Sequence, residues 1–279
     1  MDLKKKEATV IVNDTKKVFK KLGACSSTFY YLLNREFGYL KEEDERASNP
    51  FAGGIMQKGH QCGMLWGSAL AVGAESYRRC SNHDQAVGLA IHATQHLIAS
   101  FSKRTKSVNC REITDTDFSS KFAMLKYMLF KARYCFNLSE KWAPEAIQSA
   151  TEGLSLEQSD VPRTATSCAT EVVKKMGASD EKAVTVAGFA GGLGLSGNAC
   201  GALSAAIWMK TLAWNREHSK KSSFSNPDAT KTFNAFEEVT DSEILCHKIS
   251  GKRFKSIDDH TEFIKNGGCE RLITVLSQT

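Results

Sequence analysis

The sequence predicts an all-α protein made of two similar helical domains, and three observations support this prediction. Only four prolines occur in 279 residues, at positions 50, 144, 162 and 227, and each is expected at a boundary between elements. Apolar residues recur every three to four positions through the long proline-free stretches, which is typical of amphipathic helices. One glycine-rich stretch occurs twice, which indicates an internal duplication.

The repeated stretch reads FAGGIMQKGHQCGML over residues 51–65 and FAGGLGLSGNACGAL over residues 189–203. At a constant offset of 138, eight of the fifteen positions are identical, whereas unrelated segments would share about one. Each copy leads from a glycine-rich turn into an apolar helix, with a cysteine at the junction. The duplication predicts a first four-cysteine domain over residues 1–152 and a second over residues 153–279, joined by the polar segment 153–161.

The first half is expected to hold five long helices. Gly23 ends a helix over residues 8–22, and Gly38 ends a second helix that starts near Cys25. The third helix, over residues 59–79, carries small residues at every fourth position, which lets another backbone approach closely. The remaining helices are expected over residues 85–101 and 117–136.

The second half repeats this order with shorter parts. Cys168 begins a helix that Gly177 ends, and a helix after Cys200 runs to about Trp214. A polar loop over residues 218–230 is expected in place of a helix of the first half. We expect the two halves to pack with approximate two-fold symmetry.

Composition narrows the class of protein. Hydrophobic residues make up 42% and charged residues 24%, as in globular proteins. The net charge of +6 is spread over short basic runs without interleaved aromatic residues, so we expect no nucleic-acid partner. Polar residues between positions 13 and 17 interrupt the N-terminal apolar segment, so we expect no signal peptide and a cytoplasmic location. The uncharged segment 183–209 is rich in glycine, and we expect it to be buried rather than to span a membrane.

Eight of the cysteines recur as equivalent residues in the two halves. Nine cysteines in a cytoplasmic chain do not indicate a disulfide framework. Buried cysteine often serves as a small hydrophobic residue, but scattered core cysteines would not recur four times in the same order in a diverged duplicate. Cys80 has no counterpart. The candidate cofactor-binding and metal-ligating residues are therefore Cys25, Cys62, Cys110 and Cys135 in the first half and Cys168, Cys200, Cys246 and Cys269 in the second.

The placement of these cysteines indicates reactive thiols. A thiol at the start of a helix lies beside unpaired backbone N–H groups and the positive end of the helix dipole, which favour thiolate. Cys62 and Cys200 are expected there, whereas Cys80 is expected near a helix C-terminus, where thiolate is disfavoured. Four thiolates match the ligands of an iron–sulfur cluster or a tetrahedral zinc site, and they equally match two dithiol pairs. No C-x-x-C spacing chooses between these possibilities.

The four-cysteine pattern, with FAGG and a Cys-Gly pair after the glycine turn, resembles the family of putative redox-active proteins with the C_GCAxxG_C_C signature. The resemblance covers residues 25–135 and again residues 168–269. Both copies depart from the family's Cys-Gly-Ala-x-x-Gly motif, because Met64 replaces the alanine in one and Ala205 replaces the last glycine in the other. The resemblance implies a small helical module with a redox role, and it implies a relation to a module of split-Soret cytochromes that is associated with an iron–sulfur centre.

We therefore expect a redox-active protein that transfers electrons through a cysteine-ligated iron–sulfur cluster, with up to one cluster in each half. A metal-free thiol–disulfide redox protein is the alternative, and a structural zinc-binding or interaction protein without turnover is a third. Whether the protein is an enzyme stays open, and its redox partner protein is not identified. Haem attachment needs Cys-x-x-Cys-His, but Glu243 precedes the Cys246-His247 pair at the required position, so no haem is expected. No Lys-Ser/Thr follows either glycine turn, so no nucleotide is expected.

Overall fold

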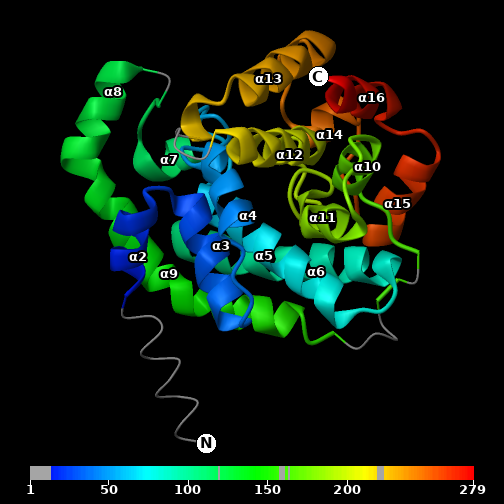
Figure 1. Ribbon diagram of the computed structural model, residues 1–279, viewed down its shortest axis with the longest axis horizontal. Coiled ribbons are helices and arrows are strands. Elements are labelled where there is room, and N and C mark those ends of the chain that lie inside the picture. Colours follow the sequence, from blue (N-terminus) through cyan, green and yellow to red (C-terminus); the bar gives the residue numbers. More distant parts are fainter. Residues whose placement is uncertain (1–13, 119, 157–160, 163, 219–222) are drawn as a thin grey trace, which may run out of the picture.

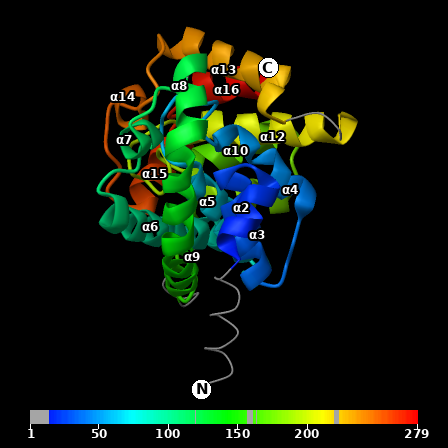
Figure 2. The ribbon, with the colours of Figure 1, turned by 90° about the vertical axis from the view of Figure 1, so that its left-hand side faces the viewer.

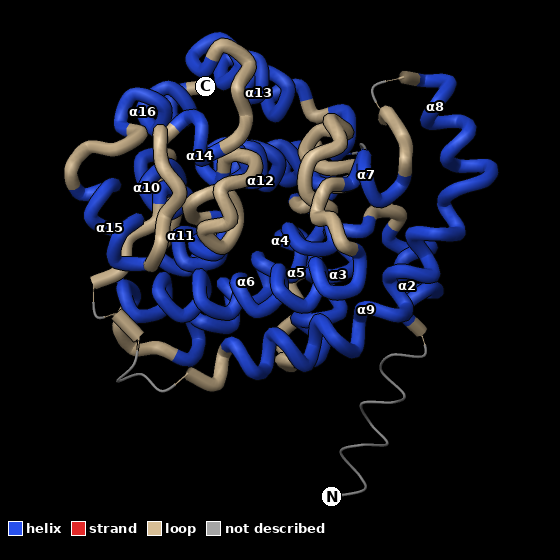
Figure 3. Tube along the Cα trace, turned by 180° about the vertical axis from the view of Figure 1, so that it is seen from behind, coloured by secondary structure: helices blue, strands red, loops and turns tan. Residues whose placement is uncertain are grey.

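The computed structural model describes residues 14–118, 120–156, 161–162, 164–218 and 223–279. Within these ranges the protein is helical and contains no β-strand, which confirms the all-α prediction (Figures 1 and 3). Two isolated bridges, Gln61–Asn109 and Ala199–Leu245, are the extended pairings in this part of the chain. The described helices include none with the length and apolar character needed to cross a membrane.

The first half follows the expected order of helices. Gly23, with φ 76°, ends the first helix as predicted, although residues 8–13 of that prediction lie outside the described residues. The helix after the glycine turn starts at residue 63 rather than at 59, because residues 59–62 belong to the turn and the bridge. The elements are α2 (Thr15–Leu22), α3 (Cys25–Glu36), α4 (Glu42–Ala47), η1 (Asn49–Phe51), α5 (Gly63–Arg79), α6 (His83–Thr105), α7 (Cys110–Thr114), α8 (Lys121–Lys126), η2 (Tyr127–Lys131) and α9 (Ala132–Gly153).

One continuous helical segment closes the first half. Figure 2 shows α8 directly above α9, and Figure 1 shows that α9 turns away from α8 and runs along the bottom of the molecule. The π-helical segment η2 joins the two α-helices without a break. The expected end of this helix at residue 136 is wrong, as is the expectation that Pro144 marks a boundary, because α9 continues through Pro144 to Gly153. Packing of α9 against α6 holds this helix together despite the proline.

The second half contains a helix that the sequence did not predict. The prediction of a loop over residues 218–230 is wrong at its end, and residues 219–222 lie outside the described residues. A helix begins at Pro227, where the Asn226 side chain accepts a hydrogen bond from the Asp228 N–H (2.9 Å). This helix follows α12 as α6 follows α5, so the order of helices repeats in both halves. The elements are α10 (Cys168–Lys175), α11 (Asp180–Thr185), η3 (Ala187–Phe189), α12 (Gly201–Glu217), η4 (Ser223–Ser225), α13 (Pro227–Thr240), α14 (Cys246–Ile249), α15 (Ile257–Lys265) and α16 (Glu270–Gln278).

Equivalent residues of the two halves touch one another at the interface. The rings of Phe51 and Phe189, which are 138 positions apart, lie 5.7 Å apart. The Ala199 N–H donates to the side-chain oxygen of its equivalent, Gln61 (3.3 Å). The packing of α5 on α11 is matched by the packing of α12 on α4. Contacts between a residue and its own equivalent occur at a two-fold axis, so the halves are related by approximate two-fold symmetry.

The interface buries a continuous hydrophobic core that both halves share. At its centre the Trp66 ring packs edge-on against Phe189, with centroids 4.7 Å apart, and both side chains are fully buried. One glycine permits close packing inside the first half, and another permits it across the interface. A Cβ atom on Gly67 would lie 2.0 Å from the Ser26 carbonyl oxygen, and one on Gly73 would lie 2.2 Å from the Thr185 carbonyl oxygen. The domain limits at residues 152 and 153 stay a prediction.

Candidate functional site

The helix starts position the cysteines. Four cysteines are the first residues of their helices, three are the residues that cap a helix start, and Cys135 lies in the first turn of α9. The first residues are Cys25, Cys110, Cys168 and Cys246, and the capping residues are Cys62, Cys200 and Cys269. All of them are buried except Cys269, which is partly exposed.

Backbone hydrogen bonds hold two cysteines of each half side by side. The Cys62 N–H donates to the Val108 carbonyl (2.8 Å), and the Cys110 N–H donates to the His60 carbonyl (2.7 Å). The second half repeats both bonds, from Cys200 to Ile244 (2.9 Å) and from Cys246 to Asn198 (2.6 Å). The equivalence of Cys110 with Cys246, which internal repetition predicted, is therefore confirmed by the backbone geometry.

Glycines make room for this arrangement. Gly54 has φ 80°, and a Cβ atom on it would lie 2.4 Å from the His60 backbone, so the turn can fold back only with glycine there. A Cβ atom on Gly63 would lie 2.7 Å from the Cys25 sulfur. The Cys25 sulfur therefore lies directly against the start of α5, beside Cys62.

All four cysteines of the first half line one cavity of about 240 Å³. Among the described residues that line it there is no charged side chain. Aromatic and sulfur-containing side chains form most of the remaining wall, with two amide or hydroxyl groups besides that of Tyr127. These wall residues are Phe19, Gln57, Met64, Ile113, Thr114, Phe118, Met124, Tyr127, Met128, Leu138 and Phe224, together with small residues of the turns.

Among the four thiols of the cavity, Cys25 is the one whose pKa is lowered. A hydrogen bond donated by the Cys62 thiol lowers the pKa of Cys25 below its ordinary value, and N–H groups of Gly53 and Ser26 act in the same direction. The same bond raises the pKa of Cys62 well above the ordinary value, because that thiol keeps its proton as the donor. The expectation that Cys62 is the thiolate-prone residue is therefore wrong, since its position at the helix start matters less than its contact with Cys25.

The other two thiols stay protonated. Burial raises the pKa of Cys110, and electrostatic repulsion from Cys25 raises it further. Burial also raises the pKa of Cys135 to about 12, although a hydrogen bond with the Tyr127 hydroxyl lowers it. Cys25 acts electrostatically on all three other thiols, which agrees with their common place around the cavity.

The comparisons with known proteins identify the family. The family model described as putative redox-active protein (C_GCAxxG_C_C) matches residues 24–146 and residues 163–278. The chain belongs to this family. The two matches confirm the duplication and assign a redox-active module to each half. No curated protein and no solved structure matches the chain.

The two C_GCAxxG_C_C modules differ around their thiols. In the second module burial is the largest effect on all four cysteines and raises the pKa of each. The aromatic pair Phe118–Tyr127, with ring centroids 4.9 Å apart, is matched 136 positions later by Phe254–Phe263, at 5.2 Å. Phe263 has no hydroxyl group, so the second module lacks the hydrogen bond that Tyr127 makes with Cys135. The modules therefore share a fold and differ in chemistry.

The thiols of this family member match a metal site in kind and number but not in arrangement. Four thiols are suitable donors for an iron–sulfur cluster or zinc. Among the described residues, however, no three Cys, His, Asp or Glu side chains are arranged to hold a metal ion. His92 and His96 lie one turn apart in α6, a spacing that could suit two metal ligands, and their ring centroids are 4.7 Å apart. His92 Nδ1 lies 3.0 Å from the Gly153 carbonyl oxygen.

Cys80, the cysteine outside the family pattern, directly follows the last residue of α5. It is buried, and burial raises its pKa. The predicted lack of thiolate character is therefore confirmed, although burial rather than the helix dipole is its largest cause.

Sequence reasoning missed the residues that cover the cavity. Met124, Tyr127 and Met128 come from the α8–η2 segment, and Phe224 comes from the other half of the chain. A signal was present in part, since KFAMLKYMLF is strongly apolar and adopts a π-helical turn, which often marks functional sites. Phe224 had no signal, because only tertiary packing brings η4 against η1 of the first half.

Proposed function

We propose that this protein performs thiol–disulfide redox chemistry at the first-half cavity, with Cys25 and Cys62 as the redox pair. The hydrogen bond between the two thiols carries this proposal. It lowers the pKa of Cys25 and so favours the thiolate, which is the attacking form in disulfide exchange, and it places a second thiol in contact with Cys25.

The reaction follows from this pair. The Cys25 thiolate attacks one sulfur of a substrate disulfide, forms a mixed disulfide and releases the other substrate sulfur as a thiolate. Cys62 then loses its proton and attacks the Cys25 sulfur, which releases the second substrate thiol and leaves a Cys25–Cys62 disulfide. Two electrons pass from the protein to the substrate, and a reductant of the dithiol class returns the pair to its starting state.

The walls of the cavity limit the substrate. Apart from the Cys25 thiolate itself, the described lining carries no charged group to pair with an ionised substrate, and an unpaired charge in an apolar cavity is costly. Phe19, Phe118 and Phe224 instead offer apolar contacts. The proposed substrate is therefore a disulfide that is uncharged and apolar near its sulfur atoms.

Electron transfer through a cysteine-ligated iron–sulfur cluster is the second candidate. The observation in its favour is that all four thiols of the first half line one cavity. Cys25, Cys62, Cys110 and Cys135 would hold the cluster, and Cys168, Cys200, Cys246 and Cys269 would be the equivalent ligands in the second half. The cluster would supply one-electron transfer, but the four sulfurs would first have to converge.

Anaerobic purification separates the candidates. Protein isolated without oxygen is analysed for iron, sulfide and zinc, and then oxidised with a small uncharged disulfide before peptide mapping. We expect a Cys25–Cys62 disulfide in the intact protein and its loss in Cys25→Ser. Iron and sulfide bound in comparable amounts, with visible absorption that disappears in Cys25→Ser, would establish the cluster instead. A protein redox partner, no nucleic-acid or membrane partner and a cytoplasmic location stay predictions of the sequence.

A further inference from the structure

The first-half cavity gathers sulfur atoms beyond the four thiols. Three of the seven methionines of the chain, Met64, Met124 and Met128, line the same cavity of about 240 Å³. Methionine often fills gaps in apolar cores, and that ordinary use would predict similar side chains at the equivalent sites. The second half instead has Ala202, His260 and Ile264 at these positions. The methionines therefore belong to this cavity and are not a general requirement of the fold.

The sulfur atoms that line the first-half cavity are soft metal ligands. Thiolate and thioether sulfur select Cu(I), whereas Mg²⁺, Ca²⁺ and Mn²⁺ prefer carboxylate and carbonyl oxygen. No described lining residue carries a carboxylate or an imidazole. The geometry also favours an ion that accepts two thiolates, because the Cys25 sulfur lies directly against the start of α5, beside Cys62.

We propose that the first-half cavity binds one Cu(I) ion between the sulfurs of Cys25 and Cys62, with the thioethers of the three methionines as additional sulfur contacts. Both thiols bind the ion as thiolates and release their protons, so two thiolates and one Cu⁺ together carry a net charge of −1. Ligation by two thiolates also needs no cluster of three metal-ligating side chains.

Copper binding is tested on the fully reduced protein, without oxygen, by titration against a chromophoric Cu(I) chelator. We expect one tightly bound Cu(I) per chain and at least a hundredfold loss of affinity in Cys25→Ser. The triple variant Met64→Leu, Met124→Leu and Met128→Leu conserves volume and should lose about tenfold, or about 1.4 kcal/mol. Met209→Leu, a methionine of α12 outside the cavity, is the matched control and should bind as the parent does.

Four results would overturn the inference. The first two are an unchanged Cu(I) affinity in Cys25→Ser and a loss of Cu(I) binding in the equivalent second-half variant, Cys168→Ser. The others are an unchanged Cu(I) affinity in the triple methionine variant and binding of Zn(II) as tight as that of Cu(I). Circular dichroism melts check that each variant is folded. The measurement does not depend on disulfide exchange, so protein that binds Cu(I) but does not react with disulfides would support this inference and refute the proposed function. Protein that reacts with disulfides but does not bind Cu(I) would support the proposed function and refute this inference.

Discussion

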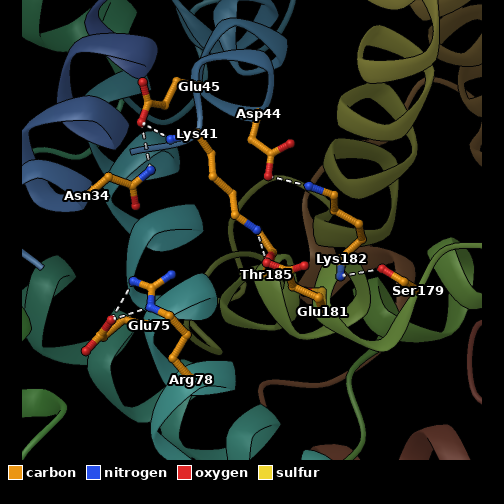
Figure 4. A network of polar contacts seen from close by, with 10 residues as sticks. All are labelled: Asn34, Lys41, Asp44, Glu45, Glu75, Arg78, Ser179, Glu181, Lys182 and Thr185. Atoms are coloured by element: carbon orange, nitrogen blue, oxygen red, sulfur yellow. Dashed lines mark hydrogen bonds and ion pairs between the residues drawn. The ribbon is translucent and has the colours of Figure 1, made fainter. Parts of the chain in front are cut away.

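Asp44 and Lys182 occupy equivalent positions in the two halves, and they form an ion pair with each other across the interface (Figure 4). The duplicated helices α4 and α11 carry opposite charges at this position, so a contact that would be repulsive between identical copies is attractive here. A second ion pair, Lys41–Glu181, lies beside it, and Glu45 receives a hydrogen bond from Asn34 (2.9 Å). The two halves therefore carry complementary charges where their equivalent helices meet.

The first prediction concerns this ion pair. The side chains of Asp44 and Lys182 are only 6% and 16% exposed, so Lys182→Met leaves a buried carboxylate without its partner. We expect a loss of about 3 to 5 kcal/mol in the free energy of unfolding, measured by urea denaturation. Arg216→Ala breaks a neighbouring pair with Glu43 whose side chains are 59% and 66% exposed, and it should cost less than about 1 kcal/mol. Equal losses of stability in the two variants would contradict the conclusion that the buried Asp44–Lys182 pair matters more than the exposed Arg216–Glu43 pair.

The second prediction concerns the space beside the Cys25 sulfur. Gly63→Ala places a methyl group 2.7 Å from that sulfur, which must move away from Cys62. We expect Cys25 to lose its selective reactivity toward iodoacetamide at neutral pH, as measured by peptide mass spectrometry. Gly88→Ala is the matched control, because its new methyl group lies equally close to a side chain (2.8 Å from Val161 Cγ1) but away from the cysteines. Unaltered Cys25 labelling in Gly63→Ala would refute the proposed contact.

The third prediction concerns pH. Thiolate is the reactive form, so the alkylation rate of Cys25 rises as the pH passes upward through its lowered pKa. Cys62→Ala removes the thiol donor, raises the pKa of Cys25 and moves the midpoint of the rate profile to higher pH. Cys80→Ala should leave that midpoint in place. A shift in Cys80→Ala without one in Cys62→Ala would mean that internal repetition identified the wrong cysteines.

The fourth prediction concerns the shared core. Phe51 is fully buried against Phe189 and Trp66 of the interface, and Phe51→Ala should destabilise the protein by about 3 to 5 kcal/mol. Phe122 of α8 is 78% exposed, so Phe122→Ala should change stability by no more than about 0.5 kcal/mol. Thermal or urea unfolding of both variants provides the comparison. A large loss in Phe122→Ala would show that α8 packs more closely than its exposure indicates.

The sequence by itself determined the features that depend on local spacing and on comparison of the chain with itself. Helical periodicity and glycine stops located α3 and α5 to within a few residues, because those signals act over one or two helical turns. The constant offset between the FAGG copies identified the duplication. The duplication in turn identified the eight cysteines that lie at or near the first residue of a helix. These conclusions needed no knowledge of which helices pack together.

Only the tertiary structure decided which thiol has the lowered pKa and what surrounds it. Cys25 and Cys62 stand at separate helix starts that look alike in sequence, and the pKa of Cys25 is lowered while that of Cys62 is raised because Gly63 lets the Cys25 sulfur approach. Phe224 reaches the cavity from the other half, and α9 continues through Pro144 because α6 packs against it. Each of these outcomes depends on distances between segments remote in the chain, and local residue patterns carry no information about those distances.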